Sequence, residues 1–280
     1  MLLNNFKKCI EVTSQTFFPL RERNFIWISY IKLLFFKKVF GDTKIYSFLG
    51  WEIYTDSFEN LRTILHEVFL SMDYYVSLNT DKPNIIDCGA NVGITTLFFK
   101  YLYPKSKILA IEPSPSTFKF LEKNIRYNNI SNVSLLNYAV SNSEGEVSFF
   151  NSSYKPGGST MVEDVYRDKK SSGNVYFEEI KVKSIKLSDY IKEKVHLLKM
   201  DIEGAEGLVF ADLDDNKIFD YIENIVFEYH YNKKNKNNTL SDIIEILERN
   251  GYDIYIYSSG FSVNLDKCGH YHFMIRASKH

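Results

Sequence analysis

The feature that most constrains the fold is a short apolar strand that breaks into glycines and then into a helical pattern. Asn84–Ile86 is typical of a buried strand, and it stops at Asp87. Gly89 and Gly93 follow, and an apolar helical pattern starts at Ile94. A strand, a glycine turn and a helix open the nucleotide-binding unit of α/β sheets, with free backbone N–H groups at the helix start facing the ligand. Gly89 permits the tight turn, and Gly93 lets the helix lie close to the strand.

The spacing of the glycines narrows the range of cofactors that the turn can bind. Ala90 stands where a dinucleotide site has its second glycine, the position that lets the backbone approach a pyrophosphate. The turn therefore favours a cofactor with a nucleoside but no pyrophosphate, and S-adenosylmethionine fits this description. Asp87 and backbone amides are candidates to meet its amino and carboxylate groups. The predicted cofactor contacts in this stretch are Asp87, Gly89, Ala90, Asn91 and Gly93.

The next predicted strand, Lys107–Ile111, ends at Glu112 and Pro113. Glu112 follows Gly93 by 19 residues (112 − 93). An acidic residue at about this distance, at the end of the second strand, is placed to accept hydrogen bonds from both ribose hydroxyls. Glu112 and Pro113 are therefore further candidate cofactor residues.

The rest of the chain alternates predicted strands and helices, which indicates a parallel sheet with right-handed crossovers. A third strand is expected over 133–140, where Asn137, Tyr138 and the Ala139 main chain are candidates to contact the adenine or are ordinary strand residues. Segments 146–150 and 176–184 have the pattern of a hairpin. The long polar connection over 151–173 favours a mobile substrate lid over a passive linker.

Three carboxylates follow the fourth predicted strand, 195–200, namely Asp201, Glu203 and Glu206. Ligands of open α/β sheets lie at the carboxyl ends of strands, beside the switch point between the first and fourth strands. Asp87 and Asp201 should therefore be neighbours across the cleft. An extended chain would send Asp201 and Glu203 to the same side. For Glu206, an interaction with a helix dipole is favoured over a catalytic role.

A fifth strand is predicted over 222–229, and Glu228 and His230 lie at its carboxyl end. A single histidine is usually structural, but one at a strand end that faces the presumed cleft is also a candidate functional group. The last two predicted strands, 252–257 and 270–275, would close the sheet as an antiparallel pair.

Composition bounds the partners and the surroundings of the chain. The 280 residues carry a formal net charge of −1, so no basic field argues for nucleic acid. The three cysteines are scattered and odd in number, which favours a reducing compartment and hence the cytoplasm. We expect an N-terminal extension and small lobe over residues 1–80 and a cofactor-binding domain over 81–280.

Residues 1–40 are basic and aromatic, and 26–40 have helical propensity. Lys32, Lys37 and Lys38 interrupt the apolar run, so it does not reach the roughly 20 residues that span a bilayer. Two interpretations stay open. The segment is either a helical cap on the core or a partner chain, or an amphipathic helix that contacts a membrane surface peripherally.

These motifs together resemble the FkbM-type methyltransferases. The resemblance rests on four stretches that occur in the family's order, and it extends over about residues 51–275. The stretches are Ile86-Asp87-Cys88-Gly89-Ala90-Asn91-Val92-Gly93, Ile111-Glu112-Pro113-Ser114-Pro115, Ala139-Val140-Ser141 with Gly145, and Leu198-Lys199-Met200-Asp201-Ile202-Glu203-Gly204-Ala205-Glu206. The resemblance implies a class I methyltransferase fold, with a seven-stranded, mostly parallel sheet and helices on both faces. It also implies S-adenosylmethionine as donor and O-methylation of a sugar, a glycan or a secondary metabolite.

Methyl transfer to a hydroxyl calls for a base, because an alcohol is a poor nucleophile at neutral pH. Asp201 is the first candidate and His230 the second, and Glu203 and Glu228 are candidates to orient the acceptor or to raise the basicity of His230. Asp201, Glu203 and His230 could instead hold a divalent metal, but they lack a distinctive ligand spacing and no metal is predicted.

Competing functions are an NAD-dependent oxidoreductase and a non-catalytic nucleoside-binding module. Ala90 in the glycine turn and the C-terminal strand pair count against the oxidoreductase, and the carboxylate Asp201 beside the cofactor motif counts against the module. A nucleic-acid methyltransferase is disfavoured by the near-neutral charge, the acidic region around Asp201 and the lack of an Asn/Asp-Pro-Pro-aromatic motif.

Overall fold

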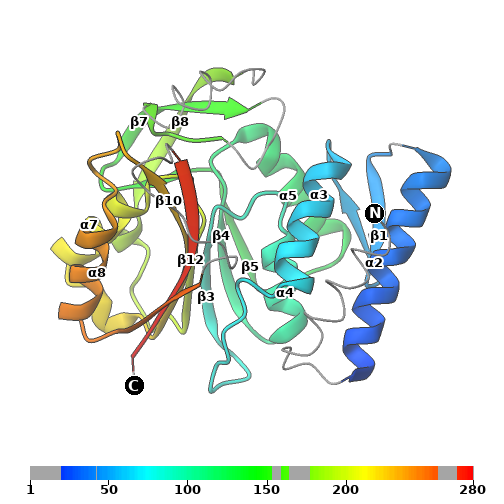
Figure 1. Ribbon diagram of the computed structural model, residues 1–280, viewed down its shortest axis with the longest axis horizontal. Helices are drawn as coiled ribbons and strands as arrows, with labels where there is room; N and C mark the ends of the chain where they lie inside the picture. Colours follow the sequence, from blue (N-terminus) through cyan, green and yellow to red (C-terminus); the bar gives the residue numbers. More distant parts are fainter. Residues whose placement is uncertain (1–19, 42, 153–158, 164–176, 258–269, 280) are drawn as a thin grey trace.

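A seven-stranded sheet forms the centre of the molecule (Figure 1). The computed structural model describes residues 20–41, 43–152, 159–163, 177–257 and 270–279. The strand order is β11-β12-β10-β9-β3-β4-β5, and β12 runs in the direction opposite to the other six strands. The strands are β3 (Asn84–Cys88), β4 (Lys107–Ile111), β5 (Val133–Leu136), β9 (Leu197–Met200), β10 (Asn224–Asn232), β11 (Asp253–Tyr257) and β12 (His270–Ser278). The predicted mostly parallel α/β sheet and its antiparallel closure are confirmed.

Helices cover both faces of this sheet (Figure 1). One face carries α4 (Ile94–Leu102) and α5 (Pro115–Tyr127), and the other carries α7 (Glu206–Asp215) and α8 (Leu240–Arg249). Short 3-10 turns, η3 (Leu187–Asp189) and η4 (Phe219–Tyr221), lie between the later elements. Ser114 and Thr239 cap α5 and α8 by accepting hydrogen bonds from the backbone of the first turn, which fixes where these helices begin.

The core is divided by the alternation of side chains along the strands. Ile85 packs in the cluster on the α4 and α5 face, whereas Ile86 packs in the cluster on the α7 and α8 face. Leu197 and Leu198 divide in the same way on the neighbouring strand. Strands buried on both faces need continuous apolar runs, which is why these segments show no polar alternation in the sequence.

A separate three-stranded sheet lies above the carboxyl ends of the central strands (Figure 1). It consists of β6 (Ala139–Ser141), β7 (Gly145–Ser152) and β8 (Phe177–Lys186), in the order β6-β8-β7. The antiparallel pairing of β7 and β8 confirms the predicted hairpin. Most of the lid predicted over 151–173, namely residues 153–158 and 164–173, lies outside the described residues.

The third strand predicted over 133–140 is wrong in its length. It divides into β5 and β6, which belong to different sheets. At the break, the Asn137 side-chain amide donates to the backbone carbonyls of Glu112 (2.8 Å) and Pro113 (3.0 Å). A polar side chain that satisfies two carbonyls of the neighbouring segment competes with continuation of the strand.

The N-terminal region packs against the α4 and α5 face. It contains α2 (Leu20–Phe40), β1 (Ile45–Phe48), β2 (Trp51–Tyr54), α3 (Phe58–Leu65) and a π-helical turn, η1 (His66–Leu70). One core cluster includes residues of all of these elements together with residues of the central sheet. The division of the chain at residue 80 stays a prediction, because this cluster runs across it. Among the described residues, no helix is long and apolar enough to cross a membrane.

Candidate functional site: a cavity at the carboxyl ends of β3, β4 and β9

The glycine turn after β3 lies directly against the end of β9. The two strands are parallel neighbours, and the Asp201 backbone N–H donates to the Cys88 carbonyl at 3.1 Å. Gly89 adopts a φ of 75°, and a Cβ at this position would lie 1.9 Å from the Asp201 carbonyl oxygen. Only glycine permits so close a backbone approach together with a positive φ. The predicted adjacency of the first and fourth strands is therefore confirmed, with Gly89 at the contact.

A cavity opens at this junction and gathers most of the predicted site residues. Its lining comprises Gly89, Asn91, Ile111, Glu112, Pro113, Tyr138, Ala139, Val140, Phe149, Ser159, Met161, Asp201, Ile202 and Glu203. The lining thus joins the glycine turn, the end of β4, the start of β6 and the segment after β9. Pro113 and Ala139, predicted from strand ends alone, line it as well.

Glu112 is held in place by backbone amides. Its two carboxylate oxygens accept hydrogen bonds from the backbone N–H groups of Asn91 (2.9 Å) and Ser114 (3.0 Å). Burial raises the pKa of Glu112 to about 7, although these amides act in the opposite direction. A carboxylate has about four lone-pair directions, so these two bonds leave acceptor capacity that hydroxyl groups in the cavity can use.

Asp87 has partners other than those predicted. It is fully buried, and it accepts a hydrogen bond from Thr96 Oγ1 (2.7 Å) and pairs with Lys199 Nζ (3.2 Å). Lys199 Nζ also donates to the Gly89 carbonyl at 2.9 Å. Burial lowers the pKa of Lys199, but the charges of Asp87 and Asp201 outweigh it and raise that pKa. The pair of Asp87 and Lys199 therefore stabilises the glycine turn through the hydrogen bond to the Gly89 carbonyl. Asp87 itself is absent from the cavity lining.

Three other predicted cofactor residues also lie behind the lining. Ala90 is buried in the core on the α4 side. Gly93 precedes α4 with a φ of 94°, and a Cβ there would lie 2.8 Å from the side chain of Leu121. The close approach is therefore to α5 and not, as predicted, to the strand. Asn137 binds the carbonyls of the segment after β4, as described above. Direct contacts from Ala90, Gly93 and Asn137 to the cofactor stay predictions, and in this structure their role is to shape the lining.

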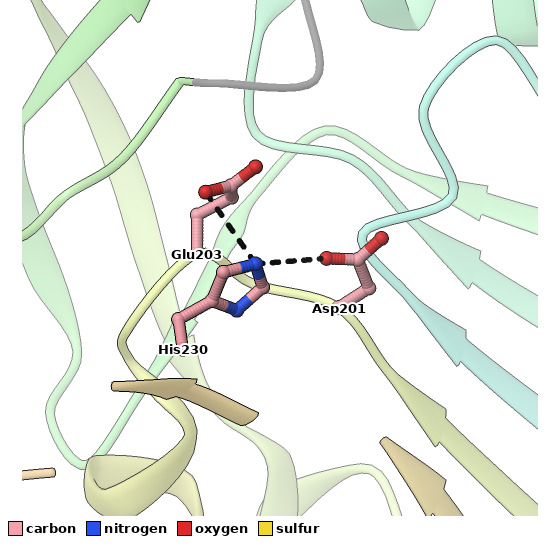
Figure 2. Close-up of side chains that lie close together, drawn as sticks. All are labelled: Asp201, Glu203 and His230. Carbon is pink, nitrogen blue, oxygen red and sulfur yellow. Dashed lines mark ion pairs between the residues drawn. The ribbon is translucent and has the colours of Figure 1, made fainter. Parts of the chain in front are cut away.

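Asp201, Glu203, Glu228 and His230, here called the acid cluster, meet where β9 ends and where the pairing of β10 with β9 stops. The predicted end of the fifth strand at residue 229 is wrong, because β10 stays paired with β12 up to Asn232 and so contains both Glu228 and His230. Three carboxylates surround the Nε2 atom of His230, with Glu203 at 3.6 Å and Asp201 and Glu228 at 3.9 Å each (Figure 2 shows the first two). The Nδ1 atom lies 3.0 Å from Glu206 Oε1, which fixes the orientation of the ring. The structure thus brings together all four residues predicted as catalytic.

The convergence of Asp201 and Glu203 has another cause than the one expected. The chain is not extended between them, since β9 ends at Met200 and Glu203 adopts a left-handed φ of 55°. Such a conformation costs roughly 1–2 kcal/mol for a residue other than glycine. Glu206 opens α7 as predicted for an acid at a helix start, but it is also fully buried and paired with His230.

The protonation states in the acid cluster follow from burial and from like charges. Burial and the charge of Asp201 raise the pKa of Glu228 to about 8, although His230 opposes this. Burial alone would lower the pKa of His230, but the carboxylates of Glu203 and Glu206 outweigh it and hold that pKa well above its usual range. At neutral pH the imidazole is therefore protonated and Glu228 is largely neutral.

Two residues near the acid cluster were not predicted from the sequence, namely Glu67 in the π-helical turn η1 and Tyr74 in the loop after it. The Tyr74 hydroxyl lies 3.1 Å from Asp201 Oδ2, to which it donates, and 3.4 Å from Glu228 Oε2. Burial and the charge of Asp201 raise the pKa of Glu67 to about 7. Lys199 was also missed, although it lies in a motif that the analysis used. Only a three-dimensional contact identifies Tyr74 and Glu67, because no local pattern marks either residue.

A divalent metal has one candidate set of ligands in the described part of the chain. Asp201, Glu203 and His230 each offer one ligand atom, and these atoms all lie within 4.8 Å of one another. Oxygen ligands with one imidazole suit a hard or borderline cation. The absence of a metal, predicted from the sequence, stays a prediction.

Comparison with known proteins identifies the family. A family model described as "Methyltransferase FkbM domain" matches residues 87–254. The chain belongs to the FkbM methyltransferase family. Methyltransferase 1 of Beauveria bassiana is 34% identical over 176 residues, which are 58% of this chain and 70% of the relative. Methyltransferase sdnD of Sordaria araneosa is 30% identical over 216 residues, which are 68% of this chain and 82% of the relative.

Solved structures with a similar arrangement are more distant in sequence. The FkbM methyltransferase of Methylobacillus flagellatus KT is 15% identical over 80% of this chain, with a TM-score of 0.47, and the match spans 56% of that chain. M. jannaschii TYW2, solved in complex with AdoMet, is 17% identical over 85% of this chain and 86% of that one, with a TM-score of 0.45.

This chain, as a member of the FkbM family with the seven-stranded sheet described above, has a class I methyltransferase fold, and its cofactor is S-adenosylmethionine. The residues present fit this cofactor. Glu112 is positioned for the ribose hydroxyls, Gly89 and Asn91 bring backbone to the cavity, and the apolar Pro113 and Ala139 suit an adenine. The NAD-dependent oxidoreductase considered for the sequence is excluded by family membership.

Proposed function

We propose that this chain transfers a methyl group from S-adenosylmethionine to a hydroxyl of a sugar, a glycan or a secondary metabolite, with Asp201 as general base. The observation that carries this proposal is the position of Asp201. It is among the residues that line the cavity together with Glu112 and Gly89, and its carboxylate belongs to the acid cluster, so one residue joins the cofactor motif to that cluster. When bound, the cofactor supplies an electrophilic methyl group on a sulfonium.

Asp201 fits the role of base better than His230 does. A general base must be able to accept a proton, and the surrounding carboxylates keep the His230 imidazole protonated at neutral pH. Asp201 receives a hydrogen bond from Tyr74 on Oδ2, while Oδ1 is directed toward His230 at 3.9 Å. An acceptor hydroxyl near Oδ1 would donate its proton there, and the same oxygen faces the imidazolium of His230.

Glu203, Glu228 and His230 act as positioning residues in this proposal. Glu203 is among the residues that line the cavity, and its carboxylate, which lies 3.6 Å from the imidazolium, is of a kind that can accept a hydrogen bond from another hydroxyl of the acceptor. Glu228, neutral at pH 7, can donate its own proton. A polyhydroxylated acceptor suits this set, because several donors and acceptors converge within a small volume.

The test is transfer of a labelled methyl group from S-adenosylmethionine to a panel of sugars, glycans, hydroxylated metabolites and amines. Label in a hydroxyl acceptor, lost in Asp201→Asn and largely kept in His230→Gln, would support the proposal. Transfer to amines alone would replace O-methylation by N-methylation. The reverse order of the two variants would make His230 the base.

A metal-assisted reaction would use the same residues, and a chelator separates the two mechanisms. The proposed base needs no metal, so activity should survive EDTA. Loss of activity in EDTA that added Mg²⁺ or Mn²⁺ restores would assign Asp201, Glu203 and His230 to metal binding instead. A folded protein that binds S-adenosylmethionine but methylates nothing in the panel would favour the non-catalytic module.

A further inference from the structure

Helix α2 presents large apolar side chains to solvent along its outer face. Its inner face is buried through Ile26, Tyr30 and Leu33, which pack in the core cluster of the α4 and α5 face. On the outside, Ile28 is 50% exposed and Phe35 is 65% exposed. The exposed large apolar residues of this helix are Phe25, Ile28, Ile31, Phe35, Phe36, Val39 and Phe40.

This exposure is concentrated on α2. Among the described residues, every exposed phenylalanine and the one exposed valine lie on this helix. The large exposed hydrophobic side chains elsewhere in the described residues are Ile45, Ile256 and five tyrosines, and a tyrosine keeps a polar hydroxyl in water. Large apolar side chains on the outer as well as the inner face of a helix are normally covered on both faces. The outer face of α2 therefore has the composition of a covered surface.

The charge of the helix indicates what covers it. The helix contains five basic residues and one acid, Glu22, so it carries a net charge of +4 (5 − 1) in a chain whose total is −1. The basic residues are Arg21, Arg23, Lys32, Lys37 and Lys38. Lys32 and Lys38 are exposed beside the apolar side chains. Apolar and cationic groups on one helix face match the interface of a bilayer that contains anionic lipids. A second copy of this chain fits less well, since it would bring two cationic helices together.

We propose that α2 binds the surface of an anionic membrane, lying in the plane of the interface with Ile28 and Phe35 inserted among the lipids. The helix is too polar to cross a bilayer, which agrees with an in-plane orientation. It lies at the edge of the molecule opposite α7 and α8 (Figure 1). None of its residues lines the cofactor cavity, so binding through α2 would leave that cavity accessible.

The test is sedimentation of the full chain with vesicles of phosphatidylcholine alone and of phosphatidylcholine mixed with phosphatidylglycerol. We expect binding to the mixed vesicles only, weakened by added salt. The double variant Ile28→Ser/Phe35→Ser and the double variant Lys32→Glu/Lys38→Glu should each bind at least tenfold more weakly. Tyr255→Ser/Ile256→Ser is the matched control, because it removes two similarly exposed side chains from β11 and should bind as wild type.

Folding is checked separately through the melting temperature and the affinity for S-adenosylmethionine, which α2 variants should not change. Failure of wild type to bind mixed vesicles, or equal binding to both kinds of vesicle, would overturn the proposal. So would a dimer in light scattering that Ile28→Ser/Phe35→Ser dissociates, because it would assign the face to a second copy. A large drop in the melting temperature of Ile28→Ser/Phe35→Ser without vesicles would also overturn it, because it would show that another part of this same chain covers the outer face of α2.

Discussion

At one end of the cavity the Glu112 carboxylate accepts hydrogen bonds from two backbone amides, whereas at the other end three carboxylates of the acid cluster surround one imidazole. The first arrangement satisfies a single charge with fixed dipoles. The second brings like charges together, and protons on Glu228 and His230 offset the repulsion. The contrast suggests a division of labour, with rigid recognition of the cofactor at the Glu112 end and proton transfer in the acid cluster.

Asp201→Asn gives the largest expected effect and tests this division most directly. An amide keeps the size of the side chain but cannot accept a proton, so kcat should fall by roughly 10²–10⁴-fold. The affinity for S-adenosylmethionine should stay within about threefold of wild type, because the predicted ribose contacts lie at Glu112. Steady-state kinetics and calorimetry measure the two quantities. An equal loss of cofactor affinity and of kcat would show that the two ends do not act separately.

Gly89→Ala should break the contact that joins the two ends. The added Cβ would lie 1.9 Å from the Asp201 carbonyl, so β3 and β9 must separate. Gly50→Ala is the control, since its φ of 88° imposes a similar backbone cost but no atom lies within 4 Å. Relative to this control we expect an additional loss of about 3 kcal/mol, or about 6–12 °C in melting temperature. Equal melting temperatures for the two variants would contradict the close approach.

Glu112→Ala should weaken the binding of S-adenosylmethionine by about tenfold or more, roughly 1.4 kcal/mol, because the predicted ribose contacts are lost. Calorimetric titration measures this, with NAD as a negative control. The exposed carboxylate Glu122 on α5 offers a matched substitution, Glu122→Ala, which should leave the affinity unchanged. Unaltered affinity in Glu112→Ala would remove Glu112 from the cofactor site and, with it, the recognition half of the comparison.

How much the sequence could predict differs between the two ends. Gly89, Gly93 and Glu112 follow from local rules, because a turn after a strand fixes the backbone within a few residues. The adjacency of the first and fourth strands, which brings Gly89 against Asp201, follows from the order of strands in such sheets. Asp87 itself lies outside the cavity lining, so the prediction that it faces Asp201 across the cleft is not confirmed. The acid cluster was located by the same reasoning, but its electrostatics were not, since they depend on burial.

Contacts between distant side chains were beyond the sequence. Tyr74 reaches Asp201 across 127 residues of sequence, and Lys199 pairs with Asp87 from another strand. The first contact depends on where a side chain of a loop points, which no periodicity encodes. The second depends on the register of β3 and β9, which places Asp87 opposite Lys199. Asp87 shows the consequence, because the motif located it correctly while its expected partner was a cofactor group. The left-handed Glu203 is a similar case, since an extended chain was the natural expectation.

The smallest expected effect is a pH dependence of stability that arises in the acid cluster. The folded-state pKa values of Glu228 (about 8) and Glu67 (about 7) lie above the ordinary value of 4.5 for glutamate, and that of His230 is raised as well. Below their ordinary pKa values these groups hold the same protons in both states. As the pH rises, the unfolded chain loses them first, so the stabilisation decreases until each folded pKa is passed.

Melting temperatures should therefore fall from the ordinary glutamate pKa of 4.5 up to about pH 8, and Glu228→Gln should flatten this slope. Glutamine keeps the shape of the neutral acid and has no proton to lose, so its contribution of at most about 1.4 kcal/mol per pH unit disappears. Glu59→Gln, which removes an exposed carboxylate on α3, should keep the wild-type slope. A slope that Glu228→Gln leaves unchanged would mean that Glu228 is ionised in the folded chain. The repulsion in the acid cluster would then be offset by something other than protons, and a bound cation at Asp201, Glu203 and His230 would be the first alternative to measure.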